Sequence, residues 1–172
     1  MSILTDETIL PSEALAEAAA LLKLLDARGL TLATAESCTG GLIAGALTAI
    51  AGSSSVVMCG FVTYSNAAKQ RMLGVPYSVL EGYGAVSDSV ARRMAEGARR
   101  EGQVDIAVSC TGIAGPGGAT PGKPVGLVHL AVASAAGVHA VRRVFPGDRN
   151  AVRAATVAEA FALVRGALSL PR

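Results

Sequence analysis

The chain has 172 residues, of which 51% are apolar and 16% charged, with a formal net charge of +2. This length suits a single domain with a large core, and the composition excludes an intrinsically disordered chain. The small net charge and the scarcity of aromatic residues, 3% of the total, argue against a nucleic-acid partner or an anionic membrane, so an anionic ligand must be bound at a local site.

The first half of the chain predicts alternating helices and strands. A helix is expected over residues 12–29, capped by Ser12 and ended at Gly29, where a left-handed backbone suits glycine. A short strand over residues 31–35, a small-residue helix over 40–50 and a buried, β-branched strand over 56–64 follow. The order strand, helix, strand is typical of a parallel sheet.

The second half predicts the rest of one sheet. Helices are expected over residues 66–73 and 88–101, a strand over 105–110, two strands over 125–134 and 139–145 around a hairpin turn at 135–137, and a last helix from about residue 148. We therefore expect one α/β domain over residues 1–172, with its core at about 13–169, a mixed sheet and helices on both faces.

The cysteines and histidines indicate a reducing compartment and no metal. Cys38, Cys59 and Cys110 are odd in number and lack CxxC spacing, and the only histidines are His129 and His139. The N-terminus has no secretory signal, and the longest apolar piece is well short of the roughly 20 residues that cross a bilayer. We expect a cytoplasmic protein without membrane contact.

Three polar stretches rich in small residues interrupt this chain, at residues 36–41, 63–69 and 109–118. Each follows the carboxyl end of a predicted strand, which is the edge where open α/β sheets bind ligands. We expect them to converge on one site.

The first stretch places Ser37 and Thr39 at a helix start, where unpaired N–H groups suit a phosphate or an oxyanion. The commoner alternative is a simple N-cap. The second stretch offers Tyr64 and Lys69. A lysine partly removed from water can act as a base toward a serine hydroxyl, although an arbitrary helix lysine is usually solvated.

The third stretch approaches a phosphate-binding loop in the spacing of Gly117, Gly122 and Lys123. Pro124 stands where magnesium needs Ser or Thr, and a strand follows where a helix is required, so we exclude a nucleoside triphosphatase. The loop lets the backbone approach a ligand closely, and its prolines weigh against the alternative of a flexible connection.

Two further groups of residues remain open. Cys38 and Cys110 could be nucleophiles, although packing is the favoured interpretation for both cysteines and for both histidines. Arg149 and Arg153 lie one helical turn apart and could hold a carboxylate or a phosphate, although a solvated pair is commoner.

Five ordered motifs, read together, resemble the C-terminal domain of the CinA family of competence/damage-inducible proteins, whose catalytic module is nicotinamide mononucleotide deamidase. The motifs are Ala-Glu-Ser-Cys-Thr-Gly-Gly from residue 35, Val-Thr-Tyr-Ser-Asn from 62 with Lys69, Gly-Ala-Val-Ser from 84, Thr-Gly-Ile-Ala-Gly-Pro-Gly-Gly from 111 with Lys-Pro-Val-Gly from 123, and Phe-Pro-Gly-Asp-Arg from 145. The resemblance implies a three-layer α/β/α sandwich, and the chain looks like the stand-alone deamidase form.

The resemblance also implies the reaction: hydrolysis of the carboxamide of nicotinamide mononucleotide to nicotinate mononucleotide and ammonia, in pyridine nucleotide recycling. It makes Ser37 the nucleophile, Lys69 its base and Tyr64 an accessory group, with no metal or cofactor. We expect the substrate to be bound by Glu36, Cys38, Thr39, Gly40, Gly41, Thr111, Gly112, Gly115, Gly117, Gly118, Lys123 and Arg149.

The competing hypothesis is a non-catalytic module that binds a nucleotide or a protein in competence or the DNA-damage response. Both hypotheses predict a glycine-rich pocket, so only turnover separates them. Helices rich in Ala and Leu leave an apolar face for a second subunit, and we expect a homo-oligomer.

Overall fold

The computed structural model describes residues 10–169, which form six α-helices, one 3₁₀ helix and five strands. In chain order they are α1 (Ser12–Asp26), β1 (Leu32–Glu36), α2 (Leu42–Thr48), η1 (Ser53–Ser55), β2 (Val57–Val62), α3 (Asn66–Leu73), α4 (Tyr77–Tyr83), α5 (Asp88–Gly102), β3 (Ile106–Gly112), β4 (Leu127–Ser134), β5 (Gly137–Val144) and α6 (Arg149–Ala167).

The five strands form one mixed sheet in the order β2-β1-β3-β4-β5. Strand β1 pairs in parallel with both β2 and β3, whereas β4 is antiparallel to β3 and to β5. Only β4 therefore runs against the other described strands, and the turn between β4 and β5 is the hairpin that the sequence predicts. The predicted mixed, mostly parallel sheet is confirmed.

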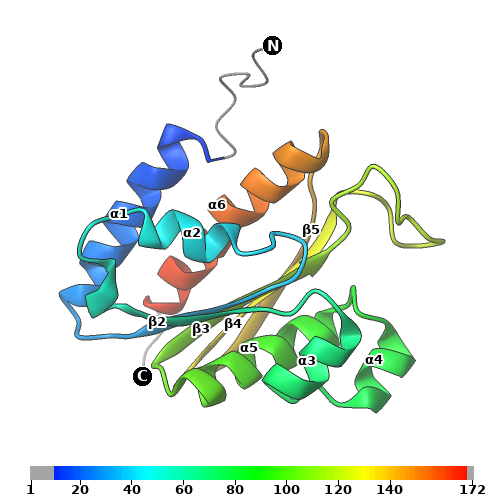
Figure 1. Ribbon diagram of the computed structural model, residues 1–172, viewed down its shortest axis with the longest axis horizontal. Helices are drawn as coiled ribbons and strands as arrows, with labels where there is room; N and C mark the ends of the chain where they lie inside the picture. Colours follow the sequence, from blue (N-terminus) through cyan, green and yellow to red (C-terminus); the bar gives the residue numbers. More distant parts are fainter. Residues whose placement is uncertain (1–9, 170–172) are drawn as a thin grey trace, which may run out of the picture.

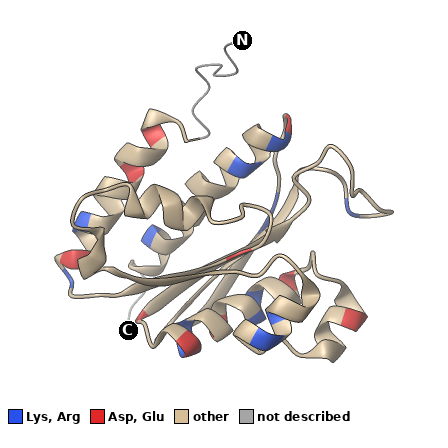
Figure 2. Ribbon diagram, viewed as in Figure 1, with Lys and Arg blue, Asp and Glu red and all other residues tan. Residues whose placement is uncertain are grey.

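Helices cover both faces of the sheet and complete the three layers (Figure 1). Helices α1, α2 and α6 pack on one face around Leu21, Leu47 and Phe161, all of them buried. Helices α3, α4 and α5 pack on the other face, where Leu73 and Met94 are buried. Charged residues lie mostly on the outer helices (Figure 2), because few polar groups can enter such an apolar core without partners.

Several local expectations differ from the structure. Helix α1 ends at Asp26 and not at the predicted Gly29. Ser12 is the first residue of α1 and makes no capping hydrogen bond, because Pro11 occupies the N-cap position. Helix α2 is shorter than predicted, since Gly41 at its N-cap is left-handed. Strand β2 is half exposed in alternation because it forms the edge of the sheet, and α4 was not predicted.

The topology brings the carboxyl ends of β1, β2 and β3 to one edge of the sheet. The turn into α2 follows β1, the connection into α3 follows β2, and the long loop before β4 follows β3. This is the edge at which the three polar stretches were expected to meet. Among the described residues, no helix is long and apolar enough to span a membrane.

Candidate active site

The three polar stretches converge on one cavity at the carboxyl edge of the sheet. Its lining comes from the β1–α2 turn, the β2–α3 connection, the segment before α5, the loop after β3 and the start of α6. The lining residues are Ser37, Cys38, Tyr64, Lys69, Ala85, Val86, Thr111, Gly112, Ile113, Ala114, Gly115, Gly117, Gly118 and Arg149. The structure therefore brings the three proposed catalytic residues together.

The turn that carries Ser37 is fixed by its own backbone. The Ser37 N–H donates to the carbonyl of Cys110 at 3.1 Å, which continues the β1–β3 pairing by one residue. The N–H of Gly40 then donates back to the Ser37 carbonyl at 3.1 Å. Gly40 and Gly41 have φ values of +62° and +103°, which suit glycine and turn the chain into α2. Ser37 is thereby presented to the cavity.

Glu36 does not line the cavity. Its side chain is fully buried and accepts hydrogen bonds from Thr39 Oγ1 at 2.5 Å and from the backbone N–H groups of Gly41, Ile43 and Ala44 at 3.1, 3.0 and 2.8 Å. Thr39 is also buried, and neither residue, nor Gly40 or Gly41, is in the lining. These four residues shape the turn from behind.

Lys69 reaches the cavity from the first half of α3, which begins after the Ser65 side chain accepts from the Ala68 N–H at 3.1 Å. The Lys69 side chain is only 1% exposed. Its Nζ donates to Ser37 Oγ at 3.0 Å and to the Thr63 carbonyl at 2.7 Å. The amine and the alcohol are thus in direct contact, although 32 positions separate them.

The surroundings of Lys69 favour an uncharged amine. None of the ion pairs among the described residues includes Lys69. Burial lowers its pKa, because an ammonium loses its hydrating water there. A lysine with a lowered pKa is uncharged, and can therefore act as a base, at a lower pH than a solvated lysine.

The two cysteines behind Ser37 are both buried. Thr39 Oγ1 lies 3.1 Å from the Sγ of Cys110, so that thiol is part of the packed support of the turn. Interaction with Cys110 and burial raise the pKa of Cys38, which keeps its thiol protonated at neutral pH. The protonated form is a weak nucleophile, and this favours the packing interpretation of Cys38.

Tyr64 and Arg149 are in contact with each other in the cavity lining. The Arg149 Nη2 donates to the Tyr64 hydroxyl at 3.1 Å and its Nη1 donates to the Gly115 carbonyl at 2.9 Å. Arg149 thereby links the end of β2 to the loop after β3. Tyr64 is 62% exposed, so its hydroxyl is accessible to a ligand as well as to the guanidinium.

The loop after β3 forms the remaining wall. Thr111 donates from Oγ1 to the Ala85 carbonyl at 2.8 Å, which joins this loop to the segment before α5. A Cβ at Gly112 would lie 2.7 Å from the Leu127 carbonyl oxygen, so only glycine fits between β3 and β4 there. Gly117 and Gly118 are exposed in the lining, where their backbone can meet a ligand.

Two of the candidate cations contact the backbone around the cavity. Lys123 Nζ donates to the Tyr83 carbonyl at 2.8 Å and is not in the lining. Arg153 Nη2 donates to the Thr39 carbonyl at 3.0 Å, one helical turn after Arg149. Arg149 is therefore the only arginine or lysine besides Lys69 among the described lining residues.

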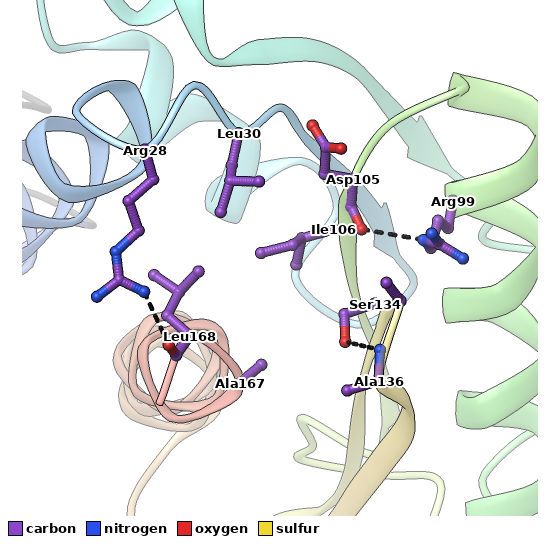
Figure 3. A pocket seen from close by; sticks show the side chains of 10 residues that line it. Arg28, Leu30, Arg99, Asp105, Ile106, Ser134, Ala136, Ala167 and Leu168 are labelled. Atoms are coloured by element: carbon purple, nitrogen blue, oxygen red, sulfur yellow. Dashed lines mark hydrogen bonds between the residues drawn. The ribbon is translucent and has the colours of Figure 1, made fainter. Parts of the chain in front are cut away.

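Sequence reasoning gave no role to four lining residues: Ala85, Val86, Ile113 and Ala114. All four fall within the motifs that carry the family resemblance, and that was the available signal. The described residues contain no group of His, Cys, Asp or Glu suited to a metal ion. A second hollow lies at the opposite edge of the sheet, between Arg28, Arg99 and Asp105 (Figure 3).

Comparison with known proteins places the chain and its fold in one family. Residues 14–168 match the family profile described as "CinA C-terminal domain". A "CinA-like protein" of Anaeromyxobacter sp. (strain K) is 56% identical over 144 residues, which are 84% of this chain and 35% of that protein. A "Putative competence-damage inducible protein" of Caldanaerobacter subterraneus subsp. tengcongensis is 47% identical over 145 residues. The chain spans about a third of the length of these curated relatives.

Solved structures agree with the sequence comparison. The crystal structure of the competence/damage inducible protein CihA from Agrobacterium tumefaciens superposes with a TM-score of 0.89 at 47% identity, covering 93% of this chain and 98% of that one. The competence damage-inducible protein A from Klebsiella pneumoniae gives the same TM-score at 35% identity, covering 92% and 99%.

Proposed function

The chain belongs to the CinA C-terminal domain family, and on that premise we propose that it is an amidohydrolase that converts nicotinamide mononucleotide to nicotinate mononucleotide and ammonia. The observation that carries the proposal is the 3.0 Å contact between Ser37 Oγ and the buried amine of Lys69. The names of the relatives refer to competence and damage and state no reaction. The choice of substrate therefore rests on the family resemblance.

The first step is attack on the carboxamide. The Ser37 oxygen bonds to the carboxamide carbon while neutral Lys69 accepts the hydroxyl proton along their existing contact. The Thr63 carbonyl, 2.7 Å from Nζ, accepts a hydrogen bond and holds the amine in place as it becomes an ammonium. A serine hydroxyl needs such a base, because it is a poor nucleophile in its protonated form.

The oxyanion requires N–H donors close to Ser37, and the structure narrows the choice. The N–H groups of Gly41, Ile43 and Ala44 already donate to Glu36, and that of Gly40 donates to the Ser37 carbonyl. In this turn, only Cys38 and Thr39 have N–H groups that donate to no oxygen of the described chain. Of these two, Cys38 lines the cavity and Thr39 does not, so we assign the oxyanion to the Cys38 N–H. One such donor is worth about 2.7–4 kcal/mol of barrier in comparable sites.

The second step releases ammonia and then the acid. The Lys69 ammonium returns its proton to the departing nitrogen, directly or through the Tyr64 hydroxyl, as the carbon–nitrogen bond breaks. Water then attacks the acyl-enzyme and Lys69 takes the proton from that water. Lys69 passes this proton to the Ser37 oxygen, which leaves as an alcohol. The products are nicotinate mononucleotide and free enzyme, and no metal or redox group takes part.

The substrate phosphate has one well-placed cation in the lining. Arg149 sits at the rim between Tyr64 and the Gly115 carbonyl, where both of its hydrogen bonds are to neutral groups. A phosphate is a stronger acceptor than either, and a guanidinium binds it with paired hydrogen bonds. The exposed backbone of Gly117 and Gly118 lies on the same wall.

The test is an ammonia assay with the purified chain and nicotinamide mononucleotide, followed by identification of nicotinate mononucleotide. Ser37→Ala, assayed in parallel, controls for contaminating amidases. Turnover by the wild type that is lost in the variant supports the proposal. Binding of the mononucleotide without turnover would instead favour the non-catalytic module.

A further inference from the structure

We propose that Glu36 is the positioning residue of the nucleophile turn: its buried carboxylate holds the turn that presents the Ser37 hydroxyl and the Cys38 oxyanion donor, without touching the substrate. This role replaces the substrate-binding one expected from the sequence. The inference deepens the proposed function and rests on it for the class of reaction.

The burial of Glu36 is the first observation. It is the last residue of β1, paired with Val62 of β2 on one side and Cys110 of β3 on the other, and its side chain has no exposed surface. No ion pair among the described residues includes it. An unpaired carboxylate at such a place is strongly unfavourable unless hydrogen bonds replace its water.

Those hydrogen bonds all come from the turn and the start of α2. Oε2 accepts from Thr39 Oγ1 and from the Gly41 and Ile43 N–H groups, and Oε1 accepts from the Ala44 N–H. One carboxylate therefore accepts hydrogen bonds from four residues within positions 39–44. It also occupies the N–H groups that would otherwise compete for an anion in the cavity.

Thr39 is held from a second direction. Its hydroxyl donates to Glu36 at 2.5 Å, while its carbonyl accepts from Arg153 Nη2 at 3.0 Å. A residue fixed at both its side chain and its carbonyl has little freedom to rotate its own N–H. Because Thr39 directly follows Cys38 in the turn, the contacts made by Glu36 limit the movement of the assigned oxyanion donor, the Cys38 N–H.

Glu36→Gln tests this role with little change in volume. An amide has one accepting oxygen, so at least one of the four donors must then face an NH₂ group. We expect kcat to fall about 100-fold, as when an oxyanion donor is removed, and KM to change less than about threefold. Thr39→Val, which removes only the hydroxyl donor, should lower kcat about tenfold and serves if Glu36→Gln does not fold.

Asp105→Asn is the matched control. Asp105 lies before β3 at the opposite edge of the sheet, and its carboxylate also accepts from a backbone N–H and a hydroxyl, both of Thr31, at 2.8 Å. The Asp105→Asn variant should have a lower unfolding temperature than the wild type and an unchanged kcat. A purely structural role of Glu36 predicts that both variants behave alike once folded.

A fluorophosphonate separates this proposal from the choice of substrate. The Ser37 oxygen bonds to phosphorus, fluoride leaves and Lys69 takes the proton, so the labelling rate, followed by mass spectrometry, depends on the turn and on Lys69 but not on the carboxamide substrate. We expect labelling of Ser37 to be at least about tenfold slower in Glu36→Gln, or about fivefold slower in Thr39→Val, than in Asp105→Asn. Equal rates would overturn the role of Glu36. Wild-type labelling without ammonia release would reject the substrate and leave that role standing.

Discussion

The two ends of strands β1 and β3 are joined in similar ways. At the carboxyl end, Glu36 accepts hydrogen bonds from the turn and from α2. At the amino end, Asp105 accepts from the N–H and the hydroxyl of Thr31, and its own N–H donates back to that hydroxyl at 3.1 Å. Each end also has a hollow beside it with cationic side chains in its lining.

The difference lies in what those cations contact. Beside Asp105, Arg28 donates to the Leu168 carbonyl at 2.7 Å and Arg99 donates to the Asp105 carbonyl at 2.9 Å, both at the surface (Figure 3). These guanidinium groups hold backbone segments together. At the carboxyl end Arg149 likewise donates to a backbone carbonyl, but the second basic group is a buried lysine in contact with an alcohol. Of these basic side chains, Lys69 is the one suited to accept a proton, because burial lowers its pKa.

The largest expected effect is on turnover, and it compares Ser37 in the hollow at the carboxyl end with Ser134 in the hollow at the amino end. Ser37→Ala should lower kcat for ammonia release at least about 10³-fold, because it removes the nucleophile, with little change in unfolding temperature. Ser134→Ala is the control in the other hollow, where the Ser134 hydroxyl accepts only from the Ala136 N–H, and it should keep wild-type turnover. If Cys38→Ser lost all turnover while Ser37→Ala kept it, the nucleophile would be the thiol.

The next effect concerns Lys69 and the pH–rate profile. Lys69→Met should lower kcat about 10²- to 10³-fold, since it removes the base. In the wild type, activity should rise with pH as the ammonium loses its proton, with a midpoint below the ordinary lysine value of 10.5. That rise should be absent in Lys69→Met and present in Arg99→Met. A wild-type profile in Lys69→Met would exclude Lys69 as the base.

The Lys69→Met variant also tests the pKa of Lys69 through the pH dependence of the free energy of unfolding. Because burial lowers the pKa of Lys69, the unfolded chain binds more protons than the folded one between the folded-state pKa and about 10.5. The stability of the wild type relative to Lys69→Met should therefore rise with pH across that window and be constant below it. Thermal unfolding of both proteins at a series of pH values measures this slope.

Much of the site could be predicted because it depends on local signals. The bounds of α3, Asn66–Leu73, match the prediction, since Ser65 caps the helix and Gly74, at φ +66°, ends it. Parallel topology then brings the ends of β1 and β2 together, which places Lys69 near Ser37. The general rule for ligand positions in α/β sheets was sufficient for this step.

Other features could not be predicted because they depend on where a side chain points in the folded protein, which the local sequence does not indicate. A glutamate at a strand end can face a ligand or the N–H groups behind it, and Glu36 faces the latter. Lys123 donates to a carbonyl 40 positions away. The exposure of β2 follows from its place at the sheet edge, which hydrophobicity along that strand does not reveal.

A smaller effect compares the arginines of the two hollows. Arg149→Ala should raise KM for nicotinamide mononucleotide about 10- to 100-fold, the range expected when a charge-assisted hydrogen bond is lost. The change should be much smaller for the corresponding nucleoside, which lacks the phosphate. Arg28→Ala, in the other hollow, should leave both KM values unchanged. Equal changes for nucleotide and nucleoside in Arg149→Ala would exclude a phosphate contact.

The smallest expected effect is on the free energy of unfolding alone, and it concerns Asp105 at the amino end of β3. Hydrogen bonds from the Thr31 backbone and side chain hold the pKa of Asp105 below its ordinary value of 3.8. A lowered carboxyl pKa stabilises the fold at pH values above that ordinary value, and the contribution disappears as pH falls through the folded-state pKa. Asp105→Asn should therefore lower the free energy of unfolding at pH 7 by no more than about 1 kcal/mol, since the group is exposed. Urea titrations of both proteins from pH 7 to pH 3 should show this difference narrowing toward the acid end, and a difference that widened with acid would show that the carboxylate does not stabilise this end of the sheet.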